Sequence, residues 1–158
     1  MSRLGAAAQV LLVVSSMTST TGTLGRANEP RQNYFNDPFV QVTNGIKSCP
    51  VPPGPALTES EMRSSAHART ERGTRCYASG QCRLSNAYLY DQEIIPRVHK
   101  RIVNDGRFAN TSVWAEGQRR WVTLKGCVRS KQEAVALEKL VREIDDVEAV
   151  INALRVLP

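Results

Sequence analysis

Four cysteines, Cys49, Cys76, Cys82 and Cys127, are the residues of this chain with the widest choice of chemistry. An even number of cysteines in an exported protein favours two disulfides, and the sequence leaves three connectivities open. A bridge from Cys76 to Cys82 closes seven residues and would stabilise the fold by about 2.4 kcal/mol. A bridge from Cys49 to Cys127 closes 79 residues, would contribute about 4.5 kcal/mol and would anchor the front of the chain to its end. Cys76 or Cys82 can also take the place of Cys49.

Zinc binding is the rival interpretation of the cysteines. Cys76 and Cys82 have the spacing C-x5-C with His67 nearby, which fits no common zinc finger. A catalytic thiol is disfavoured because the chain has no C-x-x-C motif. We therefore expect disulfides, no metal and no other cofactor.

Acid–base chemistry has few candidates, because His67 and His99 are the only histidines. His99 falls on the exposed side of a charged predicted helix. The sequence contains no G-x-S-x-G, no H-E-x-x-H and no phosphate-binding glycine loop. Asp145 and Asp146 resemble a metal-binding pair, but an acidic turn at a helix end fits better because no further ligands accompany them. We expect a protein that is not an enzyme.

Basic residues give the chain a formal charge of +6 and a pI of about 9.5. This charge suggests nucleic acid, an acidic membrane or an acidic protein as partner. The candidate lipid-binding residues lie on a predicted helix and a predicted hairpin: Arg97, Lys100, Arg101, Arg119 and Arg120. Each basic group near an anionic surface adds about 1 kcal/mol, so binding would be weak and salt-sensitive. The alternative is an ordinary solvated surface. Trp114 and Trp121 fit membrane anchors if exposed, but packing in the core or sheet fits them better.

The N-terminus carries Arg3 and then an apolar stretch from Leu4 to Val14, which is too short to span a membrane. It is typical of a signal peptide, with cleavage expected after Ala27, and a flexible N-terminus is the alternative. Removal of Arg3 and Arg26 would leave a charge of +4. Export would place the cysteines in an oxidising compartment and disfavours nucleic acid as partner.

Residues 28–57 read as irregular and Pro-rich, with an extended spacer at "CPVPPGP" (49–55). Residues 58–89 predict a short helix followed by a Cys-containing basic loop. Thr58 and Glu61 form a capping-box pattern at the start of this helix, and Gly73 is its expected end. The basic loop, 72–83, contains Arg72, Arg75 and Arg83 and no acid.

From residue 91 the pattern becomes regular. A helix over 91–105 is indicated by apolar residues on one face, with Asp91 as N-cap. Pro96 requires either a start nearer Ile94 or a kink. A hairpin follows over 110–126, with its turn around Gly117 and its second strand ended by Gly126.

A second helix begins after a capping box at Ser130–Glu133 and ends near Asp145. Its apolar residues are Leu137, Leu140, Val141 and Ile144. A last strand covers 147–156. This order predicts an α+β fold: an αββαβ sandwich whose two helices pack on one face of a small mixed three-stranded sheet. A unit of this size is marginally stable alone, so a disulfide-stapled N-terminal extension is physically sensible.

Residues 90–157 resemble a BON domain. Two segments resemble the family. "VTLKGCV" (122–128) has the pattern V-x-L-x-G-x-V, and "IDDVEAVINALRV" (144–156) contains the pattern V-x-x-V-x-N-x-L-x-V. The chain departs from the family at Asp146, where glycine is usual, in a longer hairpin turn, "EGQRR", and in having one copy of the domain where many relatives have two.

The resemblance implies an αββαβ fold in a non-enzymatic envelope protein of the periplasm. It also implies phospholipid binding in envelope or osmotic stress. The leading expectation is therefore an exported protein that binds anionic phospholipid. A protein–protein interaction module of an envelope or secretion complex is the alternative.

Overall fold

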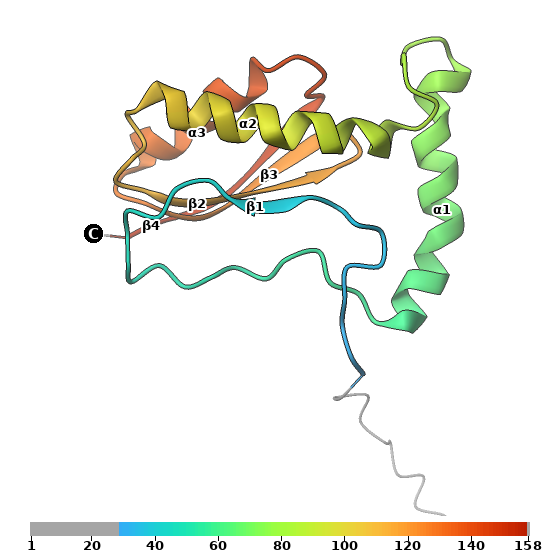
Figure 1. Ribbon diagram of the computed structural model, residues 1–158, viewed down its shortest axis with the longest axis horizontal. Helices are drawn as coiled ribbons and strands as arrows, with labels where there is room; N and C mark the ends of the chain where they lie inside the picture. The colour runs from blue at the N-terminus through green and yellow to red at the C-terminus, as the bar shows by residue number, and fades with distance from the viewer. Residues whose placement is uncertain (1–28, 158) are drawn as a thin grey trace, which may run out of the picture.

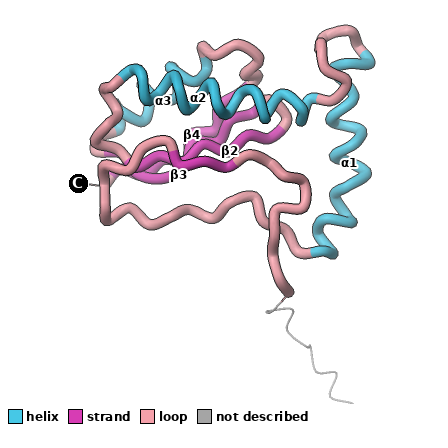
Figure 2. The backbone as a smooth tube through the Cα atoms, viewed as in Figure 1, coloured by secondary structure: helices cyan, strands magenta, loops and turns pink. Residues whose placement is uncertain are grey.

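The computed structural model describes residues 29–157, so the predicted signal peptide, residues 1–27, lies outside the described part. Two helices cover one face of the sheet, a third helix stands at one end of it, and the segment before that helix runs along the other face (Figures 1 and 2). The elements in chain order are β1 (Phe39–Gln41), α1 (Glu59–Ala78), the 3-10 helix η1 (Ala87–Tyr90), α2 (Asp91–Asp105), β2 (Ser112–Gln118), β3 (Trp121–Val128), α3 (Lys131–Arg142) and β4 (Ala149–Val156).

The sheet has four strands in the order β1-β2-β3-β4. The first two pairings are antiparallel and β3 pairs with β4 in parallel. The αββαβ order and the mixed sheet are confirmed, but the prediction of three strands is wrong. The additional strand is β1, which lies in the segment, residues 28–57, that was expected to be irregular. Three residues are too few to show a period of two, and their partner, β2, is distant in sequence.

The core lies between the helices and the sheet. Helix α2 buries Ile94, Ile95, Val98 and Ile102, and α3 buries Leu137, Leu140 and Val141. Helix α2 begins at Asp91, so a start nearer Ile94 is wrong, and Pro96 lies exposed within it. Asp91 is not its N-cap, because η1 precedes α2 directly and Asn86 caps η1 with its side chain.

The other face of the sheet carries a second apolar cluster. Trp114 and Cys127 come from the sheet, and Ile46 and Cys49 from the segment that runs along it. Cys49 is bonded to Cys127, with 5.8 Å between the two Cα atoms. The expected anchor of the front of the chain is confirmed, and it covers the face that the helices leave open.

The second disulfide joins Cys76 to Cys82. With all four cysteines of the described chain in disulfides, zinc binding by them is wrong. The Thr58–Glu61 capping box of α1 is confirmed. The helix continues past Gly73 to Ala78, so Gly73 does not end it. A Cβ at position 73 would lie 2.3 Å from the Asn86 side chain, so the helix approaches its neighbour closely at this glycine.

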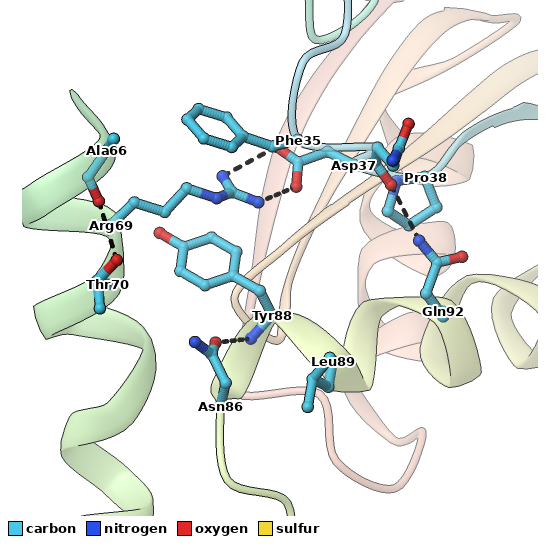
Figure 3. A pocket seen from close by; sticks show the side chains of 11 residues that line it. Phe35, Asp37, Pro38, Ala66, Arg69, Thr70, Asn86, Tyr88, Leu89 and Gln92 are labelled. Atoms are coloured by element: carbon cyan, nitrogen blue, oxygen red, sulfur yellow. Dashed lines mark hydrogen bonds and ion pairs between the residues drawn. The ribbon is translucent and has the colours of Figure 1, made fainter. Parts of the chain in front are cut away.

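Helix α1 is held by Arg69 rather than by an apolar face, because Gly73 is its only buried residue. The Arg69 guanidinium lies 4.3 Å from the ring centroid of Phe35 and 3.6 Å from that of Tyr88. It donates hydrogen bonds to both carboxylate oxygens of Asp37, one of them at 3.0 Å (Figure 3). These contacts join α1 to η1 and to the segment before β1.

The hairpin turn is tighter than expected. Arg119 and Arg120 alone connect β2 to β3, with φ values of 59° and 67°. Two left-handed residues are typical of the type I′ turn. The longer turn around Gly117 is therefore wrong, as is the end of the strand at Gly126, which lies inside β3. Helix α3 has the expected Ser130 cap and ends at Arg142. Its capping box is incomplete, because the Glu133 carboxylate accepts from the backbone N–H of Arg129.

Candidate functional site: two basic surfaces

The first basic surface is a groove between α2 and the chain that follows α3. Arg97, Lys100 and Arg101 line it from α2, where positions i, i+3 and i+4 share one side of a helix. Glu143, Ile144 and Asp145 line it from the other side, and the groove has a volume of about 440 Å³. The structure thus brings together three of the five predicted lipid-binding residues. We call this surface the α2 groove.

Acidic neighbours neutralise part of the α2 groove. Arg97 pairs with Asp146 at 2.9 Å, and Arg101 lies 4.0 Å from Glu143. Lys100 is exposed and makes no ion pair with any residue in 29–157. The Arg101–Glu143 pair is exposed and therefore weak, whereas the Arg97–Asp146 pair is partly buried.

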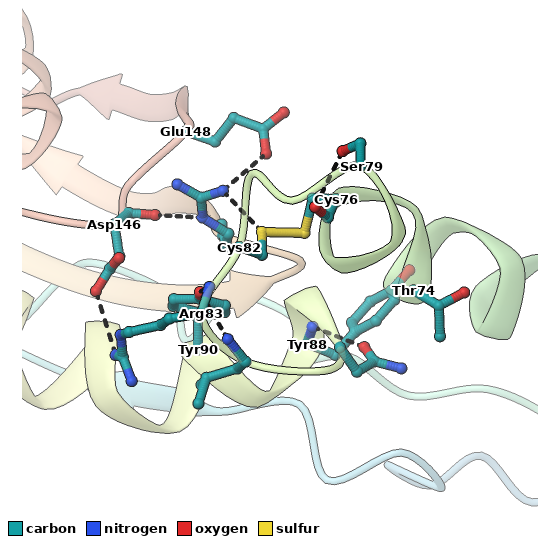
Figure 4. Close-up of a disulfide and its surroundings, with 12 residues drawn as sticks. Thr74, Cys76, Ser79, Cys82, Arg83, Tyr88, Tyr90, Asp146 and Glu148 are labelled. Atoms are coloured by element: carbon teal, nitrogen blue, oxygen red, sulfur yellow. Dashed lines mark hydrogen bonds and ion pairs between the residues drawn. A yellow bond between two sulfur atoms is a disulfide. The ribbon is translucent and has the colours of Figure 1, made fainter.

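The other two predicted residues, Arg119 and Arg120, lie in the hairpin turn and have different surroundings. Arg120 donates from Nε to the carbonyl of Asp146 at 2.9 Å, and its Nη1 lies 4.0 Å from Glu148 (Figure 4). Burial acts to raise the pKa of Asp146. Hydrogen bonds from Arg97 and Arg83 outweigh it, so the pKa lies below its usual value. Arg120 is therefore bound to the backbone of Asp146 and faces Glu148, beside the ion pairs that the Asp146 carboxylate makes with Arg97 and Arg83.

Arg119 faces a second basic surface, which sequence reasoning missed. It lines a cavity of about 410 Å³ together with Arg72 and Arg75 of α1, and with Trp121 and Ile151 of the sheet. A further cavity of about 330 Å³ shares the same three arginines. We call the surface formed by Arg72, Arg75, Arg119, Trp121 and Ile151 the α1 cleft.

One feature of the sequence pointed to the α1 cleft: residues 72–83 contain no acid. The prediction that Arg72 and Arg75 belong to a loop is wrong, because both lie in α1. The two tryptophans also differ. Trp114 is 5% exposed and packs behind the sheet as expected, whereas Trp121 is 36% exposed and its ring lies 4.9 Å from the Arg119 guanidinium.

The remaining candidates form no reactive site. His99 is exposed, as expected, and His67 lies 3.2 Å from Glu71 on the exposed side of α1. Residues 29–157 contain no group of three side chains suited to hold a metal ion. Within the same residues, no helix is both long enough and apolar enough to cross a membrane.

The family comparison agrees with the αββαβ order of α2, β2, β3, α3 and β4. Residues 90–158 match the model of the BON domain. No curated protein and no solved structure matches the chain. Residues 90–158 therefore form a BON domain, which covers less than half of the chain.

Proposed function

We propose that this protein is a non-enzymatic binding protein that associates with anionic phospholipid membranes through the α2 groove. The observation that carries the proposal is the placement of Arg97, Lys100 and Arg101 in one groove beside Ile144. The opposite face of α2 is buried in the core, so these side chains are held outward. The BON domain, with which membrane and phospholipid binding is associated, also supports the proposal.

The cellular setting is part of the same proposal. Two disulfides and a BON domain are consistent with an exported protein. We therefore place the protein in the periplasm, after cleavage of the signal peptide, with a role in envelope or osmotic-stress protection.

Co-sedimentation with vesicles tests the membrane proposal. Residues 28–158 should bind vesicles of phosphatidylglycerol and phosphatidylcholine at low salt, and should bind neither neutral vesicles nor anionic vesicles at high salt. K100Q/R101Q should bind about 30-fold more weakly, because each basic group contributes about 1 kcal/mol. K47Q/R63Q removes the same charge from exposed sites outside the groove and should bind nearly as wild type. If binding depends neither on lipid charge nor on salt concentration, the proposal is wrong.

A protein–protein interaction module is the second candidate. Strand β4 is at the edge of the sheet and exposes Ile151 and Val156. An edge strand of eight residues can pair with a strand of a partner. Recovery of one stoichiometric envelope protein in a pull-down, with no vesicle binding, would favour this candidate.

A further inference from the structure

We infer that the α1 cleft is a second anion site, which binds a phosphomonoester group through Arg72, Arg75 and Arg119. This site is distinct from the α2 groove, and no residue of it lines that groove. It combines α1, which precedes the BON domain, with the hairpin turn of the domain itself.

The three arginines converge from two elements. Arg72 and Arg75 are three residues apart on α1, so they lie on the same side of the helix. Arg119 comes from the turn between β2 and β3. All three line both cavities of the cleft. This convergence brings three guanidinium groups around one space.

The charge of these arginines is not cancelled. None of the three makes an ion pair with any residue in 29–157, in contrast to Arg97 and Arg101 of the α2 groove. Two acids line the cavities. Glu116 is 2.6 Å from Lys125, and Glu148 lies 4.0 Å from Arg120, so each has a basic partner outside the set of three. The cleft therefore keeps an excess of positive charge.

Both sides of the cleft are fixed in place without a ligand. The carboxylate of Asp91 accepts hydrogen bonds from the backbone N–H groups of Arg119 and Arg120. The Cys76–Cys82 disulfide closes the end of α1 just after Arg75 (Figure 4). Binding in a site that is already formed loses less conformational entropy. An anion entering the cleft therefore has mainly side-chain rotamers to order.

The ligand class follows from the donors. Guanidinium groups bind oxyanions with paired, planar N–H groups. A phosphomonoester carries a charge of about −1.5 to −2 at neutral pH, which suits three uncompensated arginines better than a singly charged phosphodiester. The half-exposed Trp121 and Ile151 add an apolar wall next to them. The same chemistry occurs in a free phosphate ion and in a lipid with a terminal phosphate.

Trp121 provides the test, because it lies in the cleft and Trp114 is buried elsewhere. Inorganic phosphate is titrated at constant ionic strength against chloride, and tryptophan emission is recorded. We expect a saturable change in wild type, at least a tenfold weaker response in R72Q/R75Q, and no response in W121F. R63Q/R107Q removes the same charge from two other exposed arginines and should respond as wild type. Circular dichroism verifies the fold of each variant, and R119Q, which keeps the backbone bonds to Asp91, serves if R72Q/R75Q is unfolded.

Vesicles identify the source of the phosphate group. If it is a lipid, phosphatidic acid in phosphatidylcholine should shift the Trp121 emission more than phosphatidylglycerol does, and R72Q/R75Q should abolish the difference. If it is a soluble ion, inorganic phosphate should shift the Trp121 emission, and phosphatidic acid vesicles should shift it no more than phosphatidylglycerol vesicles do. A response no larger than that to chloride, or an equal response in R72Q/R75Q, overturns the site. The α2 groove is judged separately, because K100Q/R101Q should bind phosphatidylglycerol vesicles about 30-fold more weakly and keep the response to inorganic phosphate.

Discussion

Asp91 accepts a 2.6 Å hydrogen bond from the backbone N–H of Arg119, although 28 residues separate them in sequence. Its other carboxylate oxygen accepts from the N–H of Arg120 at 2.7 Å. Both arginines have left-handed φ values, which cost non-glycine residues energy. Asp91 therefore stabilises a turn that contains neither glycine nor asparagine, and it joins the start of α2 to the hairpin.

The same contact predicts an unusual pH dependence. Burial raises the pKa of Asp91 to about 6, although the two backbone N–H groups and nearby Arg69 act to lower it; Asp37 adds to the increase. A carboxyl group whose pKa is raised on folding binds more protons in the folded state between the two pKa values. Its contribution to stability is therefore greatest below pH 4 and is lost as the pH rises through 6.

The measurement is the free energy of unfolding of wild type and D91N between pH 4 and pH 7.5. The wild-type value minus the D91N value should fall by up to about 3 kcal/mol between pH 4 and pH 6.5 and then stay level, since one pKa unit is worth about 1.4 kcal/mol. The subtraction removes carboxyl groups such as Asp146, whose lowered pKa acts in the opposite direction. A difference that does not change with pH would show that burial does not shift Asp91.

Even the smallest side chain added at Gly126 should strongly destabilise the protein. The φ of Gly126 is 112°, and a Cβ there would lie 2.2 Å from the carbonyl oxygen of Ser112 in the neighbouring strand. G126A should lower the free energy of unfolding by at least about 2 kcal/mol, since backbone strain and a clash with the main chain combine. Gly80 offers a matched control, because its φ is 72° and no atom lies within 4 Å of the added Cβ. G80A should cost about 1 kcal/mol in the same denaturation experiment, and equal losses in the two variants would contradict the clash.

Much of the BON domain was predictable because its signals are local. Ile94, Val98 and Ile102 mark one face of α2, and the Ser130 cap lies next to the helix it begins. The two disulfides could be predicted for another reason. Four cysteines allow few pairings, and loop length made Cys49–Cys127 the pairing with the larger effect on stability.

The rest depends on contacts between distant residues. Strand β1 is defined by its pairing with β2, some 75 positions away, and not by any pattern of its own. The α1 cleft requires Arg72 to meet Arg119, and no spacing in the sequence encodes that meeting. Asp91 has the residue type of an N-cap, but its carboxylate serves the hairpin turn instead.

The Cys49–Cys127 disulfide predicts a loss of stability with an optical signal. C49A/C127A should lower the free energy of unfolding by about 4.5 kcal/mol, because the bond closes the longest loop in the described chain. It should also expose Trp114, which packs against both cysteines and Ile46. In a W121F background, the emission of Trp114 should shift to longer wavelength.

The other disulfide is the matched control for this prediction. C76A/C82A should cost about 2.4 kcal/mol, since its loop is short. It should leave the Trp114 emission unchanged, because neither cysteine belongs to the cluster around that ring. An unchanged Trp114 spectrum in C49A/C127A would mean that the segment before α1 stays on the sheet without its covalent bond.

We predict that the ion pair between Arg69 and Asp37 holds α1 against the rest of the protein. The Arg69 side chain is 14% exposed and that of Asp37 is 6% exposed, so the ion pair is largely shielded from water. Removal of one partner from a buried pair typically costs about 3–5 kcal/mol. Because α1 buries no residue other than Gly73, R69A should release the helix while the core between α2, α3 and the sheet remains folded.

Hydrogen exchange resolved along the chain measures this release. Amide protons of α1 should exchange much faster in R69A, whereas those of β2 and β3 should keep their protection. R69K should be intermediate, because lysine keeps the charge but loses the paired N–H groups and the stacking on Phe35 and Tyr88. R63A, on the same helix with an exposed ion pair, should match wild type. Full protection of α1 in R69A would assign its docking to other contacts. Release of α1 should also abolish the phosphate response of Trp121, because Arg72 and Arg75 would leave the cleft with the helix.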